Sequence, residues 1–166
     1  EAIQIKGKQI IEKNPKNEVT KEIKIIEKKE TNLFIINENS VEGIKIGDTF
    51  IDHSDKFKRA TQKNGEGTFE GYNIMDKNAN VIGFAFADKR DKSKIVMIEI
   101  TSSKYKTNEG IAVGSTFGEV KEAYPNSETY GSEIESRTSV KAGNYYFLLE
   151  NIAFNTYKVD ESKIKP

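Results

Sequence analysis

The sequence contains no cysteine and no tryptophan, and its only histidine is His53. Without cysteine the chain has no disulfide bond, no thiolate metal site and no thiol nucleophile. A zinc site needs several nitrogen or sulfur ligands, and one histidine does not supply them. His53 stands beside Asp52 and close to Asp55, but neighbouring residues of a helix do not share a face. We therefore interpret His53 as a surface or packing residue, and we predict no catalytic residue, no metal site and no cofactor.

Net charge and long apolar runs are also missing. The 26 lysine and arginine residues balance 26 aspartate and glutamate residues, so no overall positive field attracts nucleic acid. No apolar run approaches the roughly 20 residues of a membrane-spanning helix. Hydrophobic residues make up 36% of the sequence, and their clustering indicates a folded chain. We predict neither nucleic-acid binding nor a membrane span.

The sequence shows no signal peptide, and it opens at Glu1 rather than at methionine. We interpret this start as that of a processed or trimmed chain. A cleaved export signal, with or without a lipid-bearing cysteine, would leave no trace downstream of the cleavage point. A lipid anchor upstream of Glu1 therefore stays open.

The sequence does contain one motif twice, first in Gly43–His53 and again in Gly110–Val120. Gly, Ile, Gly, Thr and Phe recur at the same spacing, and an acidic residue follows each threonine by three positions. This spacing fits a capping box, in which a threonine and an acidic side chain close the first turn of a helix. We expect one helix after each copy. The first would carry Phe50, Phe57 and Ala60 and fade near residues 63–65, and Pro125 would end the second.

Strict alternation of apolar residues predicts three strands between the two copies, at Thr68–Ile74, Val81–Phe86 and Ile95–Ile100. The intervening Asp76–Asn80 starts like a calcium loop, but its sixth and twelfth positions lack the required glycine and glutamate, so we interpret it as a hairpin turn. The alternation groups Tyr72 with Ile74, Ile82 with Phe84 and Phe86, and Val96 with Ile98 and Ile100.

We predict an α+β fold of two related halves, each a helix followed by an antiparallel meander, with an N-terminal β segment. Residues 1–40 would form strands that pack on the first half. Residues 41–108 would be the first repeat and residues 109–166 the second. In the second repeat, strands are expected at Thr138–Lys141, Tyr145–Glu150 and Ile152–Phe154.

Aromatic residues are the main candidates for a binding surface. Most aromatic residues on alternating strands belong to the core, and an exposed set on one sheet face would instead bind another protein. Tyr105 and Tyr130 stand in polar stretches and are expected at the rim of such a surface. The candidate protein-binding residues are Tyr72, Phe84, Phe86, Tyr105, Tyr130 and Tyr146.

The motif Ile-x-x-Gly-x-Thr-x-x-[Glu/Asp]-Val, which opens a short helix, resembles the repeat of the superfamily of β-lactamase-inhibitor proteins and SmpA/OmlA lipoproteins. Gly114–Val120 is the better match, because His53 takes the place of the valine in Gly47–His53. The family's later Leu-Gly-x-Pro is replaced by Ala123-Tyr124-Pro125. The resemblance extends over residues 43–154 and implies an exported envelope protein that binds through a sheet face.

The favoured function is non-enzymatic binding of another envelope or secreted protein, as an inhibitor, an assembly factor or an accessory lipoprotein. The location would be the periplasm, the cell envelope or the exterior of a bacterium. The competing interpretation is a hydrolase-like enzyme with a carboxylate site between the halves. A deep cleft holding two carboxyl groups of raised pKa would favour the enzyme, and a shallow aromatic sheet face would favour binding. A purely structural domain of a longer chain is a third interpretation.

Overall fold

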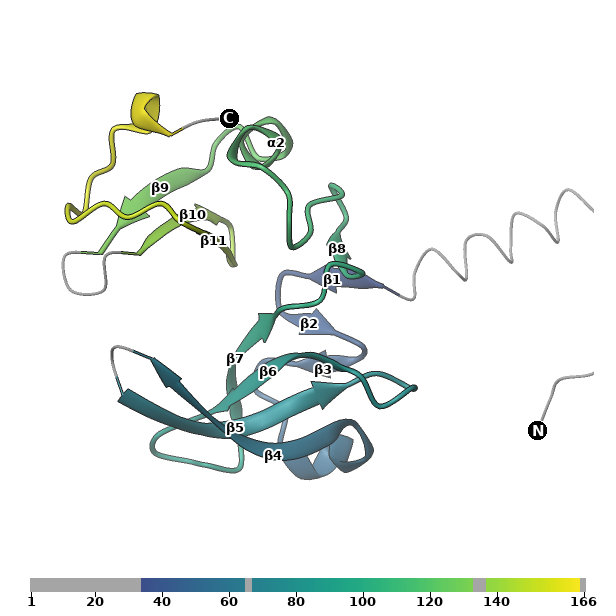
Figure 1. Cartoon of the computed structure of the whole chain (residues 1–166). Helices are drawn as coiled ribbons and strands as arrows, with labels where there is room; N and C mark the ends of the chain where they lie inside the picture. Colours follow the sequence, from purple (N-terminus) through teal and green to yellow (C-terminus); the bar gives the residue numbers. More distant parts are fainter. Residues whose placement is uncertain (1–33, 65–66, 133–136, 165–166) are drawn as a thin grey trace, which may run out of the picture. The chain divides into compact units, whose positions relative to one another are not determined.

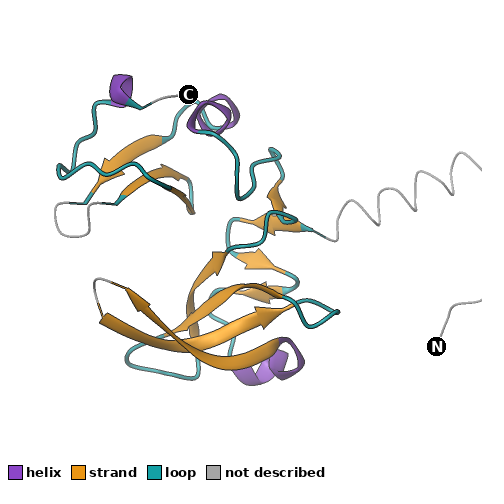
Figure 2. Ribbon diagram, viewed as in Figure 1, coloured by secondary structure: helices purple, strands orange, loops and turns teal. Residues whose placement is uncertain are grey.

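The computed structural model describes residues 34–64, 67–132 and 137–164 (Figure 1). The chain divides into two units, Glu1–Leu33 and Phe34–Pro166, and all described residues belong to the second. The strands expected before residue 34, and their packing on the first half, lie outside the described residues. The described fold is mixed α+β, mostly antiparallel sheets with short helices (Figure 2). The predicted class is thereby confirmed, while two repeated halves are not.

A small sheet joins segments that are far apart in the sequence. Its strand order is β3-β2-β1-β8, and β1 pairs in parallel with β8 while the other pairs are antiparallel. None of the described helices has both the length and the apolar character needed to cross a membrane. The bounds of the strands are Ile35–Asn37 (β1), Ser40–Val41 (β2), Ile44–Lys45 (β3) and Lys106–Thr107 (β8).

A larger antiparallel meander follows, with the strand order β4-β5-β6-β7. The three strands predicted from alternation are present as β5, β6 and β7, and the predicted turn at Asp76–Asn80 joins the first two. The carboxylate of Asp76 accepts hydrogen bonds from the backbone N–H groups of Asn78 and Asn80, which closes that turn. The bounds are Phe57–Asn64 (β4), Gly67–Met75 (β5), Val81–Ala87 (β6) and Ile95–Ile100 (β7).

Two β-bulges correct the predicted faces of this meander. Ile74 pairs with Gly83 while Met75 pairs with Val81, so Ile82 is an extra residue. A bulge reverses the alternation locally, and Ile82 therefore packs with Ala85 in the core rather than with Phe84 and Phe86.

The second bulge falls at Val96, where Phe86 pairs with Met97 and Ala87 pairs with Ile95. Ile95 consequently joins Ile98 and Ile100 at the core, and Val96 is exposed. The predicted grouping of Val96 with the two isoleucines is therefore wrong. A single inserted residue is enough to reverse the face of every position on one side of it.

The first helix is also shorter than predicted. A 3-10 helix, η1, covers Phe50–Lys56, and its next residue already has extended backbone angles. Phe57 and Ala60 therefore lie on strand β4, and the predicted helix to residues 63–65 is wrong. On strand β4, Phe57 shares a face with Arg59 and Thr61, and Ala60 lies on the other face with Lys58.

The main core lies between the meander, the small sheet and η1. Phe50 and Phe57 pack beside Tyr72, which confirms that Tyr72 and Ile74 share the core face. Burying one valine, isoleucine or phenylalanine side chain in such a core stabilises the fold by roughly 1.5–3 kcal/mol relative to leaving it exposed. The buried members are Val41, Ile44, Phe50, Ile74, Ile82, Ala85, Ile95 and Tyr105.

The C-terminal part contains a helix and a three-stranded antiparallel sheet with the order β11-β10-β9. The helix ends before Pro125, as predicted, and two of the three predicted strands are present. The third, Ile152–Phe154, is not a strand: the backbone N–H of Phe154 instead donates to the Thr138 hydroxyl. The bounds are Phe117–Ala123 (α2), Glu128–Gly131 (β9), Thr138–Ala142 (β10), Tyr145–Leu149 (β11) and Glu161–Lys163 (η2).

The repeated motif has the same local backbone in both copies. Gly47 and Gly114 have φ values of 96° and 98°, a left-handed conformation that glycine adopts without strain. The backbone N–H of Asp48 bonds to the carbonyl of Lys45, and that of Ser115 bonds equivalently to Ala112. The motif is thus a repeated turn that starts a helix, whereas the elements after it differ in number and in length.

Candidate functional site

Three of the predicted binding residues lie in the four-stranded meander, and none offers a free aromatic surface. Tyr72 is half-buried against the main core. Phe84 and Phe86 are only 3% and 6% exposed, and their rings meet edge to face with centroids 4.7 Å apart. Phe69 adds a second edge-to-face contact to Phe86. These residues form a packed aromatic group rather than a docking patch.

Tyr105 is also buried, at 1% exposure, so its expected position at a surface rim is wrong. Its hydroxyl donates to the carboxylate of Glu42 at 2.7 Å, and Phe34 packs edge-on against its ring. Burial, followed by the neighbouring Glu42 carboxylate, raises the pKa of the Tyr105 hydroxyl. The sequence around Tyr105 is polar, with a lysine on each side, so it does not indicate that the Tyr105 ring enters the core.

Tyr130 and Tyr146 do lie on one exposed sheet face, which we call the tyrosine face. It is formed by alternate residues of β9, β10 and β11 together with Tyr157. Tyr146 and Tyr157 are 65% and 67% exposed. The complete set is Glu128, Tyr130, Ser139, Lys141, Tyr146, Leu148 and Tyr157.

The sheet register arranges this face in two rows. Tyr130 pairs with Ser139, which pairs in turn with Leu148. Lys141 occupies the middle of the second row, between Glu128 and Tyr146. Residues directly opposite each other in antiparallel strands point to the same side, so each row is a continuous line of side chains.

The other side of the same sheet explains why this face is left open. Val140 is fully buried there, and Phe147 and Leu149 pack against the same cluster as helix α2. The capping box of α2 is complete: the Thr116 hydroxyl accepts from the N–H of Glu119, and the Glu119 carboxylate accepts from the N–H of Thr116. Because the helix occupies only one side, the alternating residues on the other side meet solvent.

Tyr157 reaches the face from the segment after β11. Its ring lies 5.1 Å from that of Tyr130, and its carbonyl accepts a hydrogen bond from the N–H of Gly131. Gly131 allows this approach, because a Cβ there would lie 2.3 Å from the carbonyl oxygen of Thr156. No period and no turn signal in the sequence indicates this contact.

Ionic and hydrogen-bonding contacts hold the same segment further along. Glu161 accepts hydrogen bonds from the Thr129 hydroxyl at 2.5 Å and from the Lys121 ammonium at 3.1 Å. Thr129 belongs to β9 and Lys121 to α2, so Glu161 ties η2 to both elements. These donors keep the pKa of the Glu161 carboxyl below its ordinary value, the Thr129 bond being the largest cause.

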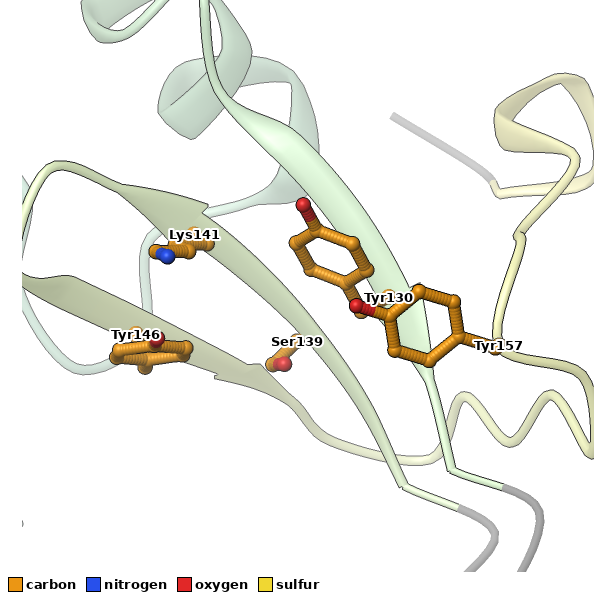
Figure 3. A pocket seen from close by; sticks show the side chains of 5 residues that line it. All are labelled: Tyr130, Ser139, Lys141, Tyr146 and Tyr157. Atoms are coloured by element: carbon orange, nitrogen blue, oxygen red, sulfur yellow. The ribbon is translucent and has the colours of Figure 1, made fainter.

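The tyrosine face has a shallow hollow of about 210 Å³. Figure 3 shows Tyr130 and Tyr157 together on one side of it and Tyr146 on the other, with Ser139 between them. The Lys141 ammonium lies 5.7 Å from the centre of the Tyr146 ring, within the range of a cation–π contact. The Tyr130 hydroxyl donates to the Glu128 carboxylate, and this bond is the main cause that raises the pKa of Tyr130 to about 12.

Other polar clusters serve local turns. The carboxylate of Asp48 lies 2.7 Å from His53 and accepts the N–H of Lys45 at 2.9 Å, and the His53 contact is the main cause that lowers the pKa of Asp48. His53 thus pairs with neither of its sequence neighbours Asp52 and Asp55. Within the described ranges, no group of three His, Asp or Glu side chains is placed to hold a metal ion.

The tyrosine face is therefore the most prominent exposed aromatic surface in the described part of the chain. The other exposed apolar residues lie apart from one another: Ile51 is on η1, Val81 is on β6, and Val113 is in the turn before α2. Scattered exposed apolar residues are ordinary on soluble proteins, whereas a cluster around a hollow marks an interaction site. No protein-family model matches this chain, and no curated protein and no solved structure shows a significant match to it.

Proposed function

We propose that this protein binds another protein through the tyrosine face and has no catalytic role of its own. The observation that carries the proposal is the exposure of Tyr146, Leu148 and Tyr157 beside Tyr130 on one rigid sheet. Tyrosine is enriched at protein interfaces because it offers a large contact area, a hydroxyl group and few rotatable bonds. The mixture of rings with Lys141 and Glu128 gives a partner both apolar and charged contacts.

The carboxyl groups support binding rather than hydrolysis. Every described carboxyl group whose pKa is shifted has a lowered pKa, and the donors are nearby backbone or side-chain groups. Asp76, Asp88 and Asp91 each accept backbone N–H groups within their own turns. A carboxyl group that serves as a general acid near neutral pH needs the opposite shift. These three aspartates therefore act as turn-forming acceptors.

The bacterial envelope is the proposed setting. Its support is the resemblance of the motif at Gly110–Val120 to the superfamily of β-lactamase-inhibitor proteins and SmpA/OmlA lipoproteins. The local geometry of both copies, with glycine in a left-handed conformation before a capped helix, is compatible with a scaffold that repeats this turn. Fractionation of the source cells with an antibody against the chain tests the setting, and recovery in the cytoplasm would contradict it.

A pull-down with matched variants tests the binding. The chain is immobilised and exposed to an envelope extract, and the double variant Tyr146→Ser, Tyr157→Ser is compared with Ile51→Ser. Ile51 is 80% exposed on η1, away from the tyrosine face. We expect one protein to be retained by the wild type and by Ile51→Ser and to be lost with the double variant. Equal retention by all three chains would refute the tyrosine face as the binding site.

A further inference from the structure

Strand β11 forms one edge of the C-terminal sheet, and its sequence is Tyr-Tyr-Phe-Leu-Leu. Among the described strands it pairs with β10 alone. It contains no charged residue, no proline and no glycine. An edge strand of this composition is a template for pairing with another strand, and proteins usually protect such edges with charges, bulges or covering segments.

The other exposed edges carry those protections. Strand β4 has Lys58, Arg59 and Lys63 along its length. Strand β7 contains the bulge at Val96. The outer side of β9 is bridged by Lys158 opposite Tyr130. Strand β11 is thus the exception among the long edges of the described sheets, and its lack of protection calls for an occupant.

The hairpin before β11 determines which backbone groups point outward. Gly143 and Asn144 form a two-residue loop between Ala142 and Tyr145. The residues that close such a loop form a hydrogen-bonded pair, and these pairs alternate along an antiparallel ladder. Phe147 consequently bonds to β10, while the N–H and C=O groups of Tyr146 and Leu148 point to the open edge.

We propose that β11 pairs with β11 of a second copy of this chain, antiparallel about a two-fold axis at Phe147. Tyr146 then stands opposite Leu148 of the second copy, and the reverse pair is equivalent. Both pairs present outward backbone groups, so each forms two hydrogen bonds. The side chains of these pairs lie on the tyrosine face. The product is a continuous six-stranded sheet with two tyrosine faces on one side.

The charges of the two copies fit this arrangement. The row Glu128–Lys141–Tyr146 of one copy continues through Leu148 and Ser139 to Tyr130 of the other. The two-fold axis generates a second, equivalent row that starts at Glu128 of the other copy. Each Glu128 and Lys141 pair is separated from its counterpart by the apolar stripe of Tyr146 and Leu148, so like charges do not meet. An isologous contact of this kind closes on itself and produces a dimer rather than a fibre.

The contact is small. Asn144 donates to the side-chain carbonyl of Asn39 at 3.1 Å, and the Tyr145 hydroxyl donates to the carbonyl of Ile36 at 2.9 Å. These bonds engage the start of β11, so the new pairing is centred on residues 146–148. Four backbone hydrogen bonds and one apolar stripe correspond to an interface at the lower end of the specific range, with dissociation on the order of micromolar or weaker.

Sedimentation equilibrium of the 166-residue chain, from micromolar to millimolar concentration, tests the proposal. We expect a monomer–dimer equilibrium. Leu148→Lys places a charge on the edge opposite Tyr146 of the second copy and weakens dimerisation about tenfold or more. Ile51→Lys is the matched control, since it adds the same charge at an exposed apolar position on η1, and it leaves the equilibrium unchanged. A wild-type chain that stays monomeric throughout would overturn the proposal.

A proline substitution separates the backbone contribution from the side chain. The N–H of Leu148 points away from β10, so Leu148→Pro removes no hydrogen bond from the existing ladder, and proline is tolerated at such edge positions. We expect a chain with an unchanged circular dichroism spectrum that no longer dimerises. Dimerisation that is unaffected by both Leu148→Pro and Leu148→Lys would place the contact elsewhere and refute the pairing.

The register is tested by disulfide trapping, because the wild-type chain has no cysteine. Tyr146→Cys and Leu148→Cys chains are mixed and oxidised. Opposite residues of a hydrogen-bonded pair have Cα atoms about 5.5 Å apart, within the range of a disulfide bond. We expect a mixed dimer in higher yield than either homodimer, and little product from Ile51→Cys. Equal yields from all combinations would contradict the register.

The dimer and the partner interaction fail separately. Dimerisation is measured on the purified chain, without extract, and it depends on the backbone edge of β11. The pull-down is repeated with Tyr157→Ser alone, because Tyr157 lies outside β11, whereas Tyr146 belongs both to the tyrosine face and to the proposed pairing. Loss of partner binding with an intact dimer would refute the proposed function alone, and loss of the dimer with intact partner binding would refute the further inference alone.

Discussion

The four-stranded meander β4–β7 and the three-stranded sheet β9–β11 both follow a copy of the same motif, yet they use their aromatic residues in opposite ways. Phe84 and Phe86 of the first sheet are buried, although they lie outside the main core. Tyr146 of the second sheet is 65% exposed, and its neighbour Leu148 is 56% exposed. The motif forms the turn and the helix before each sheet, and the segments after it determine which sheet faces are covered.

The edges differ in the same sense as the faces. The first sheet has a lysine- and arginine-bearing edge at β4 and a bulge near its other edge, both of which oppose further pairing. The second sheet has an uncharged edge at β11. We propose that stability is concentrated in the first sheet and interaction in the second.

The largest expected effect is on stability in the first sheet. Ile74 is fully buried, so Ile74→Ala leaves a cavity and lowers the free energy of unfolding by about 2–5 kcal/mol. Tyr146→Ala on the exposed face changes it by no more than about 0.5 kcal/mol. Urea denaturation of the two variants measures both values. Similar losses would show that the tyrosine face is structural, and the contrast between the sheets would fail.

Gly131→Ala tests how Tyr157 reaches the tyrosine face. The added Cβ would lie 2.3 Å from the carbonyl oxygen of Thr156 and 2.6 Å from that of Phe154, and both are backbone atoms. Relieving this overlap costs about 1–3 kcal/mol of stability and displaces the segment that carries Tyr157. We expect a changed near-ultraviolet circular dichroism spectrum along with a lower denaturation midpoint. An unchanged spectrum would mean that Tyr157 does not depend on the close approach at Gly131.

The two capping threonines should differ in energetic weight. Thr116 accepts the N–H of Glu119, whereas the Thr49 hydroxyl donates to the Asp52 carboxylate at 2.7 Å. Thr116→Ala therefore removes a hydrogen-bonded N-terminal cap and lowers the free energy of unfolding by about 1 kcal/mol. Thr49→Ala removes only an exposed contact with a carboxylate and lowers it by about 0.5 kcal/mol at most. Denaturation midpoints of both variants check the order. A reversed order would indicate that the first copy depends more on its cap than its geometry shows.

The regular elements could be predicted from the sequence because their signals are local. Alternation gave the strands at β5, β6 and β7, and Pro125 gave the end of α2. The two bulges were not predictable, since an inserted residue such as Ile82 leaves the apolar pattern intact while changing its face. Strand β4 was missed because Phe57 and Ala60 also fit a helical period.

The candidate site was predicted only in part, for a related reason. Tyr146 was expected on a strand, and its exposure follows from alternation once one face is known to be covered. Tyr130 was expected at the rim of a binding surface, in a polar stretch rather than on strand β9. Nothing local to Tyr105 or Tyr157 shows that one enters the core and the other reaches β9. Both positions depend on contacts with distant residues, Glu42 for the first and Tyr130 for the second. Long-range contacts of single side chains have no period that a sequence displays.

The smallest effect concerns the titration of Tyr130 on the tyrosine face. Its hydrogen bond to Glu128 is the main cause that raises its pKa to about 12, so the folded protein holds this proton more tightly than the unfolded chain does. The resulting contribution to stability is complete below the ordinary pKa of tyrosine, near 10, and is lost as the pH rises through about 12.

Glu128→Gln keeps an acceptor but removes the charge, and it should lower the pKa of Tyr130 towards the ordinary value. The difference in tyrosinate absorbance between wild type and variant, followed from neutral to strongly alkaline pH, isolates this one hydroxyl. Tyr130→Phe is the control, because it abolishes the difference. Tyr105 also has a raised pKa, but through burial and Glu42, so it titrates alike in every variant. A variant curve that coincides with the wild type would show that solvent, rather than Glu128, binds the Tyr130 hydroxyl, and that this hydroxyl is free to bond a partner.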